Sequence, residues 1–219
     1  MSDDRARSTD DNRARSTDDE TAENESVEID VDTLEGSLYR VLSSVVIPRP
    51  IAWVSTTGSD GVDNLAPYSF STVASVSPPI LLFAPVDDQK DSPQNVEETG
   101  EFVFNLVTED VVEPMNETAA TLPAEESEFD HVGLERAAST TVEPPRVADA
   151  KAAFECTHHE TIEVGGSVLV LGEVQYVHLD QDLLGDDEKV DVANVDAVGR
   201  LAGSMYATTQ DRFGLERPP

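Results

Sequence analysis

Short runs of alternating apolar and polar residues dominate this chain and predict β-strands rather than long helices. Two such runs, residues 51–56 and 62–76, flank a glycine-containing turn at residues 57–61 and together predict a hairpin. Residues 80–85 and 102–107 predict two further strands.

A second hairpin is predicted in the C-terminal half, where residues 152–164 and 167–180 flank Gly165 and Gly166. Near the N-terminal side, Pro48 and Pro50 cannot both lie inside a central ladder, because proline has no N–H to donate. The segment around these prolines is therefore expected to bend or to lie at a sheet edge.

Only short helices are indicated. Residues 92–100 predict one, with Ser92 at the N-cap, Pro93 at the first helical position and Gly100 at the end. Residues 110–120 predict another, which Pro114 shortens or kinks. Residues 121–150 are expected to be mostly loop, with His131 solvated within it.

The absence of an alternating strand–helix–strand rhythm argues against a doubly wound parallel sheet. Strands in hairpins with two short helices instead predict a mainly β fold, an antiparallel barrel with small helical additions. A chain of 219 residues is long enough for one domain with a substantial core.

The first 33 residues have a different composition. Residues 5–20 contain a tandem repeat, RARSTDDN followed by RARSTDDE, with no apolar side chain larger than alanine. Such a segment cannot bury enough surface to order itself, so residues 1–33 are predicted to be a disordered acidic tail and 34–219 the folded domain. A binding role for the repeat stays open beside an inert, solvating one.

Charge is the strongest compositional signal, with 45 acidic residues against 14 basic ones and a net charge of −31. Most of the acids lie outside the tail, so the folded part is acidic in its own right and its self-repulsion opposes compaction. Molar salt screens that repulsion, because the Debye length falls to about 3 Å at 1 M. The composition favours a protein of a salt-accumulating (halophilic) microbe and excludes a nucleic-acid partner, which needs a basic surface.

No apolar run is long enough to span a membrane, and residues 1–25 lack the apolar segment of a secretory signal. We therefore expect a cytoplasmic protein with no membrane partner. The lone Cys156 lies near His158 and His159, but side chains of neighbouring strand residues point to opposite faces. A structural role for these three residues is favoured over a metal site.

Two segments could bind an anion despite the acidic background. Lys90 and Ser92 lie at a predicted helix N-terminus, where free N–H groups and the helix dipole favour negative charge. The alternative is that Ser92 only caps the helix and Lys90 is solvated. Residues 66–71 place two hydroxyls and an aromatic ring on a predicted strand, which ordinary strand packing also explains.

Several segments in order resemble the flavin reductase-like, FMN-binding split-barrel family, from about residue 36 to residue 218. They are PRPIAWVST at 48–56, NLAPYSF at 64–70, KDS at 90–92, FVFN at 102–105, FEC at 154–156, LGEV at 171–174, and GRL at 199–201 with Tyr206. The resemblance implies a six-stranded antiparallel, Greek-key-like split β-barrel with short helices, forming a homodimer with FMN between its protomers.

The resemblance also implies roles for ten residues. It implies that the FMN phosphate is bound by Lys90, Ser92, Ser69 and Ser71. It implies that the isoalloxazine is bordered by Trp53, Ser55, Tyr68 and Phe70. Asn95 and Arg49 would serve the ribityl or phosphate end. Many relatives have a second aromatic residue where this chain has Ser71, so the pocket wall is expected to differ there.

Flavin chemistry asks little of protein side chains, which agrees with the lack of a clear acid–base pair or catalytic triad. The first hypothesis is an NAD(P)H-dependent FMN reductase or related flavin oxidoreductase. The alternatives are a non-catalytic FMN electron carrier working with a redox protein partner, and a flavin-binding structural protein.

Overall fold

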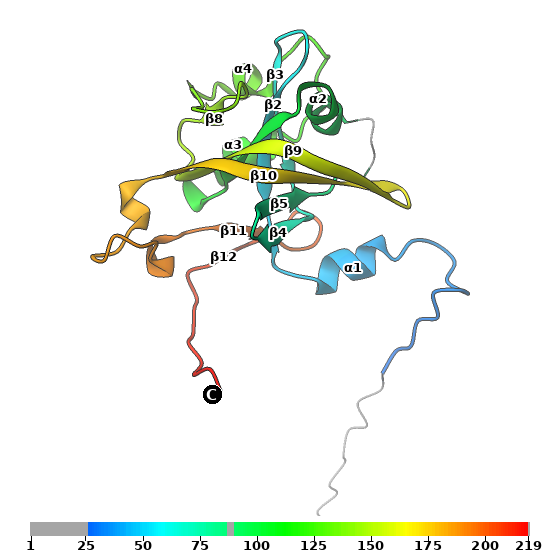
Figure 1. Cartoon of the computed structure of the whole chain (residues 1–219). Helices are drawn as coiled ribbons and strands as arrows, with labels where there is room; N and C mark the ends of the chain where they lie inside the picture. The colour runs from blue at the N-terminus through cyan, green and yellow to red at the C-terminus, as the bar shows by residue number, and fades with distance from the viewer. Residues whose placement is uncertain (1–25, 87–89, 219) are drawn as a thin grey trace, which may run out of the picture. The chain divides into compact units, whose positions relative to one another are not determined.

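The computed structural model of this protein describes residues 26–86 and 90–218. Tyr39–Pro219 form one compact unit of antiparallel strands with short helices (Figure 1). The predicted tail lies outside the described residues as far as residue 25, and residues 26–33 are exposed and form neither helix nor strand. Within the described parts, no helix has the length and apolar character needed to cross a membrane.

Seven antiparallel strands form the main sheet, in the order β3-β2-β6-β9-β10-β5-β4. Their bounds are β2 Ala52–Thr57, β3 Asp63–Tyr68, β4 Ser71–Val76, β5 Pro79–Phe83, β6 Glu101–Leu106, β9 Ala152–Val164 and β10 Ser167–Leu179. The long β9–β10 hairpin, which crosses the middle of Figure 1, confirms the second predicted hairpin.

The two edges of this sheet are joined by a very short link. Strands β3 and β4 lie at opposite edges, although only Ser69 and Phe70 separate them in the chain. The sheet therefore curls until its two edges approach each other at this link, and the Ala84 amide, which donates to the Phe70 carbonyl at 2.7 Å, extends the β4–β5 pairing to it. The antiparallel split barrel is confirmed, but the single strand predicted at 62–76 is wrong. The bend at Ser69 divides it, which makes seven strands where six were expected.

Two small sheets complete the β-structure. In the first, β1 (Arg49–Pro50) pairs with β11 (Val198–Arg200), and β11 pairs with β12 (Tyr206–Thr208). The second consists of β7 (Arg136–Ala137) and β8 (Arg146–Val147). Strand β1 has two residues and lies outside the main sheet, as expected for a segment flanked by two prolines.

Helix α2 lies beside the barrel and differs from expectation at its start. The helices are α1 Tyr39–Val45, α2 Asp91–Thr99, α3 Val112–Glu117 and α4 Glu128–Val132, with 3₁₀ turns η1 Glu109–Val111, η2 Gln181–Leu183 and η3 Val192–Asn194. Lys90 occupies the N-cap position of α2, so the prediction of Ser92 as N-cap is wrong. Gly100 ends this helix as predicted, with φ of 78°, in the left-handed region that favours glycine.

The segment predicted at 110–120 is helical but broken into η1 and α3, with Pro114 in the first turn of α3, where proline is tolerated. Residues 121–150 are mostly loop as expected, interrupted by the five-residue helix α4 and by β7 and β8. His131 is exposed as expected, but it lies in α4.

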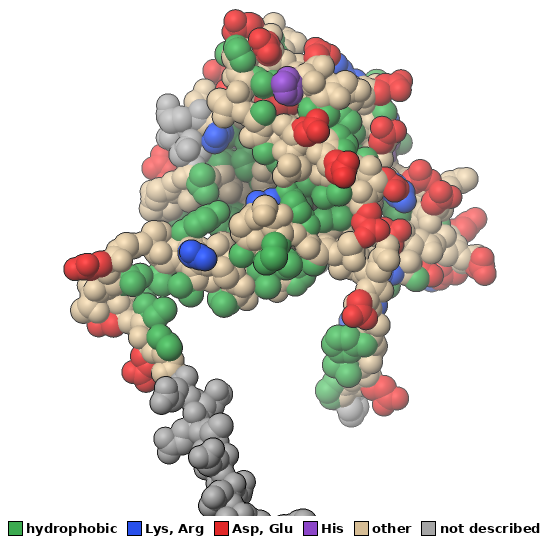
Figure 2. Space-filling view, turned by 180° about the vertical axis from the view of Figure 1, so that it is seen from behind, with side chains coloured by type: hydrophobic (Ala, Val, Ile, Leu, Met, Phe, Trp, Pro, Cys, Tyr) green, Lys and Arg blue, Asp and Glu red, His purple; other side chains and the backbone are tan. Residues whose placement is uncertain are grey.

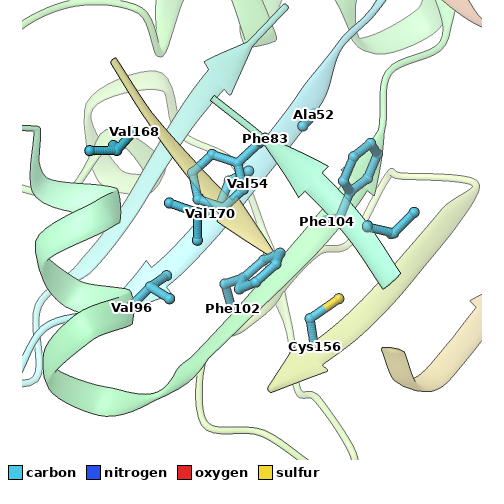
Figure 3. Packing of buried hydrophobic residues seen from close by; sticks show 10 residues of the cluster. Ala52, Val54, Phe83, Val96, Phe102, Phe104, Cys156, Val168 and Val170 are labelled. Atoms are coloured by element: carbon cyan, nitrogen blue, oxygen red, sulfur yellow. The ribbon is translucent and has the colours of Figure 1, made fainter. Parts of the chain in front are cut away.

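The barrel interior is filled by apolar side chains that alternate along the strands (Figure 3). The Phe83 and Phe102 rings pack edge to face with centroids 5.2 Å apart, a favourable arrangement for aromatic pairs. Gly172 on β10 faces Phe102 so closely that a Cβ there would overlap the ring. Cys156 belongs to this interior, and burial raises the pKa of its thiol. His159, by contrast, is exposed, so these side chains do not converge on one point.

A second apolar cluster lies outside the barrel, beneath the helices that follow β6. Its largest members are Trp53, Phe129, Leu65 and Met115, all fully buried. Because Trp53 and Leu65 come from β2 and β3, this cluster anchors α3 and α4 to the sheet edge beside the site described next.

Candidate functional site

Three adjoining cavities open beside strand β3. The first, here the Lys90 cavity, has a volume of about 140 Å³. Strand β3, the N-terminal end of α2 and the segment after α3 line it, and its walls include Ala66, Pro67, Tyr68, Lys90, Thr118 and Ala119. Among the described residues of its walls, Lys90 is the one basic side chain, and Asp91 and Glu128 are the acidic ones.

The second, the arginine cavity, measures about 290 Å³. Its walls include Ser43, Arg49, Ser69, Asn116, Arg200 and Tyr206. Pro67 and Ala119 line both this cavity and the Lys90 cavity, so the two adjoin at uncharged residues; together they are called the groove here, with basic residues in each of its two cavities.

The third, the acidic cavity, measures about 240 Å³ and continues from the Lys90 cavity on the other side. Its described wall residues include Asp60, Asp91, Glu98, Glu126 and Glu128 and no basic one. Such a wall repels a phosphate, so an anionic ligand favours the groove over this cavity.

A buried polar network supports the floor of the Lys90 cavity. Glu128, only 5% exposed, accepts hydrogen bonds from Asn64 Nδ2 at 3.0 Å and from the Leu65 amide at 2.9 Å. Burial raises the pKa of Glu128, and Asp91 adds to the rise, although the hydrogen bonds oppose it. Ser92 donates to Asn64 Oδ1 at 2.7 Å, which ties α2 to this network.

Several residues predicted at the site lie behind its wall instead. Trp53 is fully buried, and its Nε1 donates at 2.9 Å to Oγ1 of Thr118, a residue of the wall. Ser55 is also fully buried and donates to the Pro145 carbonyl. Ser71 donates to the Pro50 carbonyl at 2.9 Å. None of these three, nor Ser92, lines any of the three cavities.

The other predicted residues reach the surface of the site or its margin. Tyr68 and Lys90 line the Lys90 cavity, and Ser69 and Arg49 line the arginine cavity. Asn95 lines the acidic cavity and donates to Thr56 Oγ1 at 2.9 Å.

Phe70 is half-buried, lines none of the three cavities, and stacks under the Arg49 guanidinium at 5.5 Å. The structure thus brings Arg49, Tyr68, Ser69 and Lys90 to one groove.

Sequence reasoning missed Arg200, Tyr206, Asn116 and Glu128 as wall residues. Arg200 and Tyr206 were noted only as part of a motif. Glu128 and Asn116 give no local signal, because their partners Asn64 and Tyr206 are 64 and 90 residues away.

One face of the molecule is more apolar than the protein's composition suggests (Figure 2). Figure 2 shows hydrophobic side chains gathered over the middle of one face with Lys and Arg among them, while acidic side chains are most numerous toward the margins. Helix α1, which contributes Tyr39 and Ser43 to the arginine cavity, exposes Leu42 and Val45, the latter by 70%. The arrangement suits a ligand with a flat apolar part and an anionic end.

Comparison with known proteins gives consistent matches. Residues 43–194 match the model of the flavin reductase like domain. An uncharacterized protein of Deinococcus radiodurans is 39% identical over 194 residues, which cover 84% of this chain and 86% of that protein.

Two solved structures are also similar. Nitrilotriacetate monooxygenase component B from Bacillus cereus is 31% identical, with a TM-score of 0.83 over 88% of this chain and 100% of its own. The 2-nitrobenzoate 2-nitroreductase of Pseudomonas fluorescens is 32% identical, with a TM-score of 0.81 over 88% of this chain and 96% of its own.

Proposed function

Because this chain belongs to the flavin reductase-like family, we propose that it is an FMN-dependent oxidoreductase that binds FMN in the groove and accepts electrons from NAD(P)H. The observation that carries the proposal is the placement of cations. In a chain of net charge −31, Lys90 and Arg49 line one groove, and neither forms an ion pair with any carboxylate among the described residues.

The residues present suit FMN. An ammonium or guanidinium at the ends of the groove can hold a phosphate, and Ser69 adds a hydroxyl donor. Tyr68 and Pro67 offer a flat apolar surface for the ring system. The buried Nε of Arg49 has no hydrogen-bond partner, which marks this residue as incompletely satisfied by the protein alone.

The flavin, when bound, supplies the hydride chemistry, and the protein's part is to hold it and to exclude water. We propose that Lys90 contacts the FMN phosphate, that Tyr68 borders the isoalloxazine, and that Ser69 offers a hydroxyl donor on the side of the arginine cavity. Trp53, Ser55, Ser71 and Ser92 would then hold the wall in place, because their polar atoms already bond within the protein.

We further propose that a second copy of the chain completes the site. Tyr39 and Ser43 of α1 line the arginine cavity, so an interface formed through this helix would lie beside the groove. Exposed apolar side chains on α1 and β4, including Val45 and the 85%-exposed Val76, are available for such an interface.

Lys90→Ala tests the proposal. We expect the FMN dissociation constant, measured by flavin fluorescence quenching in molar KCl, to rise about 10- to 100-fold, because a charge-assisted contact contributes about 1.5–3 kcal/mol. Lys189→Ala is the matched control, since Lys189 is exposed and paired with Asp187. Equal FMN affinity in wild type and Lys90→Ala would remove the phosphate assignment, and a colourless protein that takes up no FMN would end the proposal.

Turnover distinguishes a reductase from an electron carrier. A reductase oxidises NADH or NADPH rapidly when free FMN is in excess, and it exchanges its flavin readily. Slow reduction by both nicotinamides together with flavin retained through purification would favour the carrier.

A further inference from the structure

The arginine cavity contains two arginines held directly opposite each other. Arg49 on β1 and Arg200 on β11 are Cα partners in an antiparallel pair. Directly opposite residues point to the same face with Cβ atoms about 4.5–5.5 Å apart, and like charges in that arrangement destabilise the pair. Arg49 is only 9% exposed, so solvent screens the repulsion poorly there.

Neutral groups of the protein orient both guanidiniums. Arg49 donates to the carbonyls of Ser43, Val46 and Leu201. Arg200 donates to the Gly203 carbonyl and the Tyr206 hydroxyl, and its guanidinium lies 4.5 Å from the Tyr206 ring centroid. These contacts fix the position of each charge and leave the charge itself uncompensated.

Among the residues that the structure describes, no carboxylate compensates these charges. The described walls of the arginine cavity include no acidic residue, and neither arginine forms an ion pair with a described residue. Elsewhere in this acid-rich chain, Arg136, Lys151 and Arg212 all pair with aspartates. Two converging cations without a counter-ion form an anion site, and a guanidinium fork matches phosphate geometry.

We propose that the arginine cavity binds a phosphate group of a nucleotide reactant, with Arg200 as a principal ligand beside Arg49. The inference deepens the proposed function, because it takes the groove as the place where flavin and nicotinamide meet. Lys90 lies at one end of that groove and the two arginines at the other, across the uncharged stretch of Pro67 and Ala119. The groove therefore offers one phosphate site to each of two nucleotides.

The phosphate can come from FMN or from the nicotinamide, and Arg200→Gln separates the sources. If FMN supplies it, the dissociation constant for FMN rises about 10- to 100-fold while that for riboflavin, which lacks the phosphate, is unchanged. If the nicotinamide supplies it, KM for NADH or NADPH rises by a similar factor with kcat and FMN affinity retained. Arg200→Lys should recover part of either loss, because it restores the charge without the fork.

Arg217→Gln is the control for net charge, since Arg217 is exposed and lines none of the three cavities. Unchanged constants for FMN and both nicotinamides in Arg200→Gln would overturn the proposal. Equal weakening of FMN and riboflavin would also overturn it, since that result means a distorted cavity rather than a lost phosphate contact.

Inorganic pyrophosphate gives a readout that does not depend on flavin. We expect its ³¹P resonance to broaden with wild-type protein and with Arg217→Gln, but not with Arg200→Gln, at fixed KCl. Broadening in a protein that takes up no flavin would retain the anion site while the proposed function fails. Normal flavin binding by the wild type, without broadening of the pyrophosphate resonance, would overturn the anion site and leave the proposed function standing.

Discussion

Two buried glutamates show how differently this fold treats the same side chain. Glu155 on β9 is fully buried, and Glu128 at the start of α4 is 5% exposed. Burial alone raises the pKa of a carboxyl group, because it disfavours the charged form. The pKa of Glu128 is indeed raised, whereas that of Glu155 falls to about 2.

The number of donors explains the difference. Burial raises the pKa of Glu155, but the hydroxyl and amide of Thr141, the Thr140 amide and His178 Nε2 outweigh it with contacts of 2.6–2.7 Å. Glu128 accepts from Asn64 and Leu65 on one oxygen and from its own backbone amide, and these bonds do not outweigh its burial and the nearby Asp91. The carboxylate of Glu155, with all four of these contacts, holds residues 140–141 against the sheet. The less fully hydrogen-bonded carboxylate of Glu128 instead borders the Lys90 cavity and the acidic cavity.

Glu155→Gln should have the largest effect. The substituted amide places an N–H₂ group against donors of Thr140, Thr141 or His178, so we expect unfolding free energy to fall by about 3–4 kcal/mol at pH 7. Urea denaturation at fixed KCl measures it. Glu160→Gln, on an exposed position of the same strand, should stay within about 0.5 kcal/mol of wild type. Equal stability of the two variants would mean that the four contacts do not fasten the loop.

The loss of stability at acidic pH should show nearly as large an effect of Glu155. Because the folded pKa of Glu155 lies below its ordinary value of 4.5, its stabilisation is present above pH 4.5 and is lost as pH falls toward 2. We expect wild type to lose about 3 kcal/mol of its advantage over Glu155→Gln across that window. Subtracting the two urea-denaturation curves cancels the other carboxylates, and a difference that stays flat with pH would contradict the assignment.

The structural features that were predicted correctly are set by residues only a few positions apart in the sequence. The β9–β10 hairpin and the Gly100 end of α2 follow from turn residues and alternation within a few positions. The split barrel came from a resemblance carried by ordered segments. The same reasoning misplaced the N-cap at Ser92, which lies inside α2 and donates to Asn64 Oδ1, a partner 28 residues away that local rules cannot identify.

The site was only half predictable for the same reason. Lys90, Tyr68 and Ser69 stand out as a cation, an aromatic ring and a hydroxyl in recognisable motifs. Arg200 becomes significant only when the β1–β11 pairing sets it opposite Arg49, 151 positions earlier in the chain. The indole of the buried Trp53 donates to Thr118, 65 residues later, so its orientation also depends on a partner that is distant in the chain.

Glu128→Gln should have the smallest effect and the opposite pH trend. The substituted carbonyl can still accept from Asn64 and Leu65, and the change removes a desolvated charge, so we expect stability within about 1 kcal/mol of wild type at pH 7. Because the folded pKa of Glu128 is raised, its favourable contribution is full below pH 4.5 and disappears as pH rises through the folded value. The stability of Glu128→Gln relative to wild type should therefore increase with pH, measured by the same urea curves, with the exposed Glu126→Gln as control. If Glu128→Gln lost as much stability as Glu155→Gln, both carboxylates would be structural. The number of hydrogen-bond donors would then not distinguish a glutamate that stabilises the fold from one that lines the candidate site.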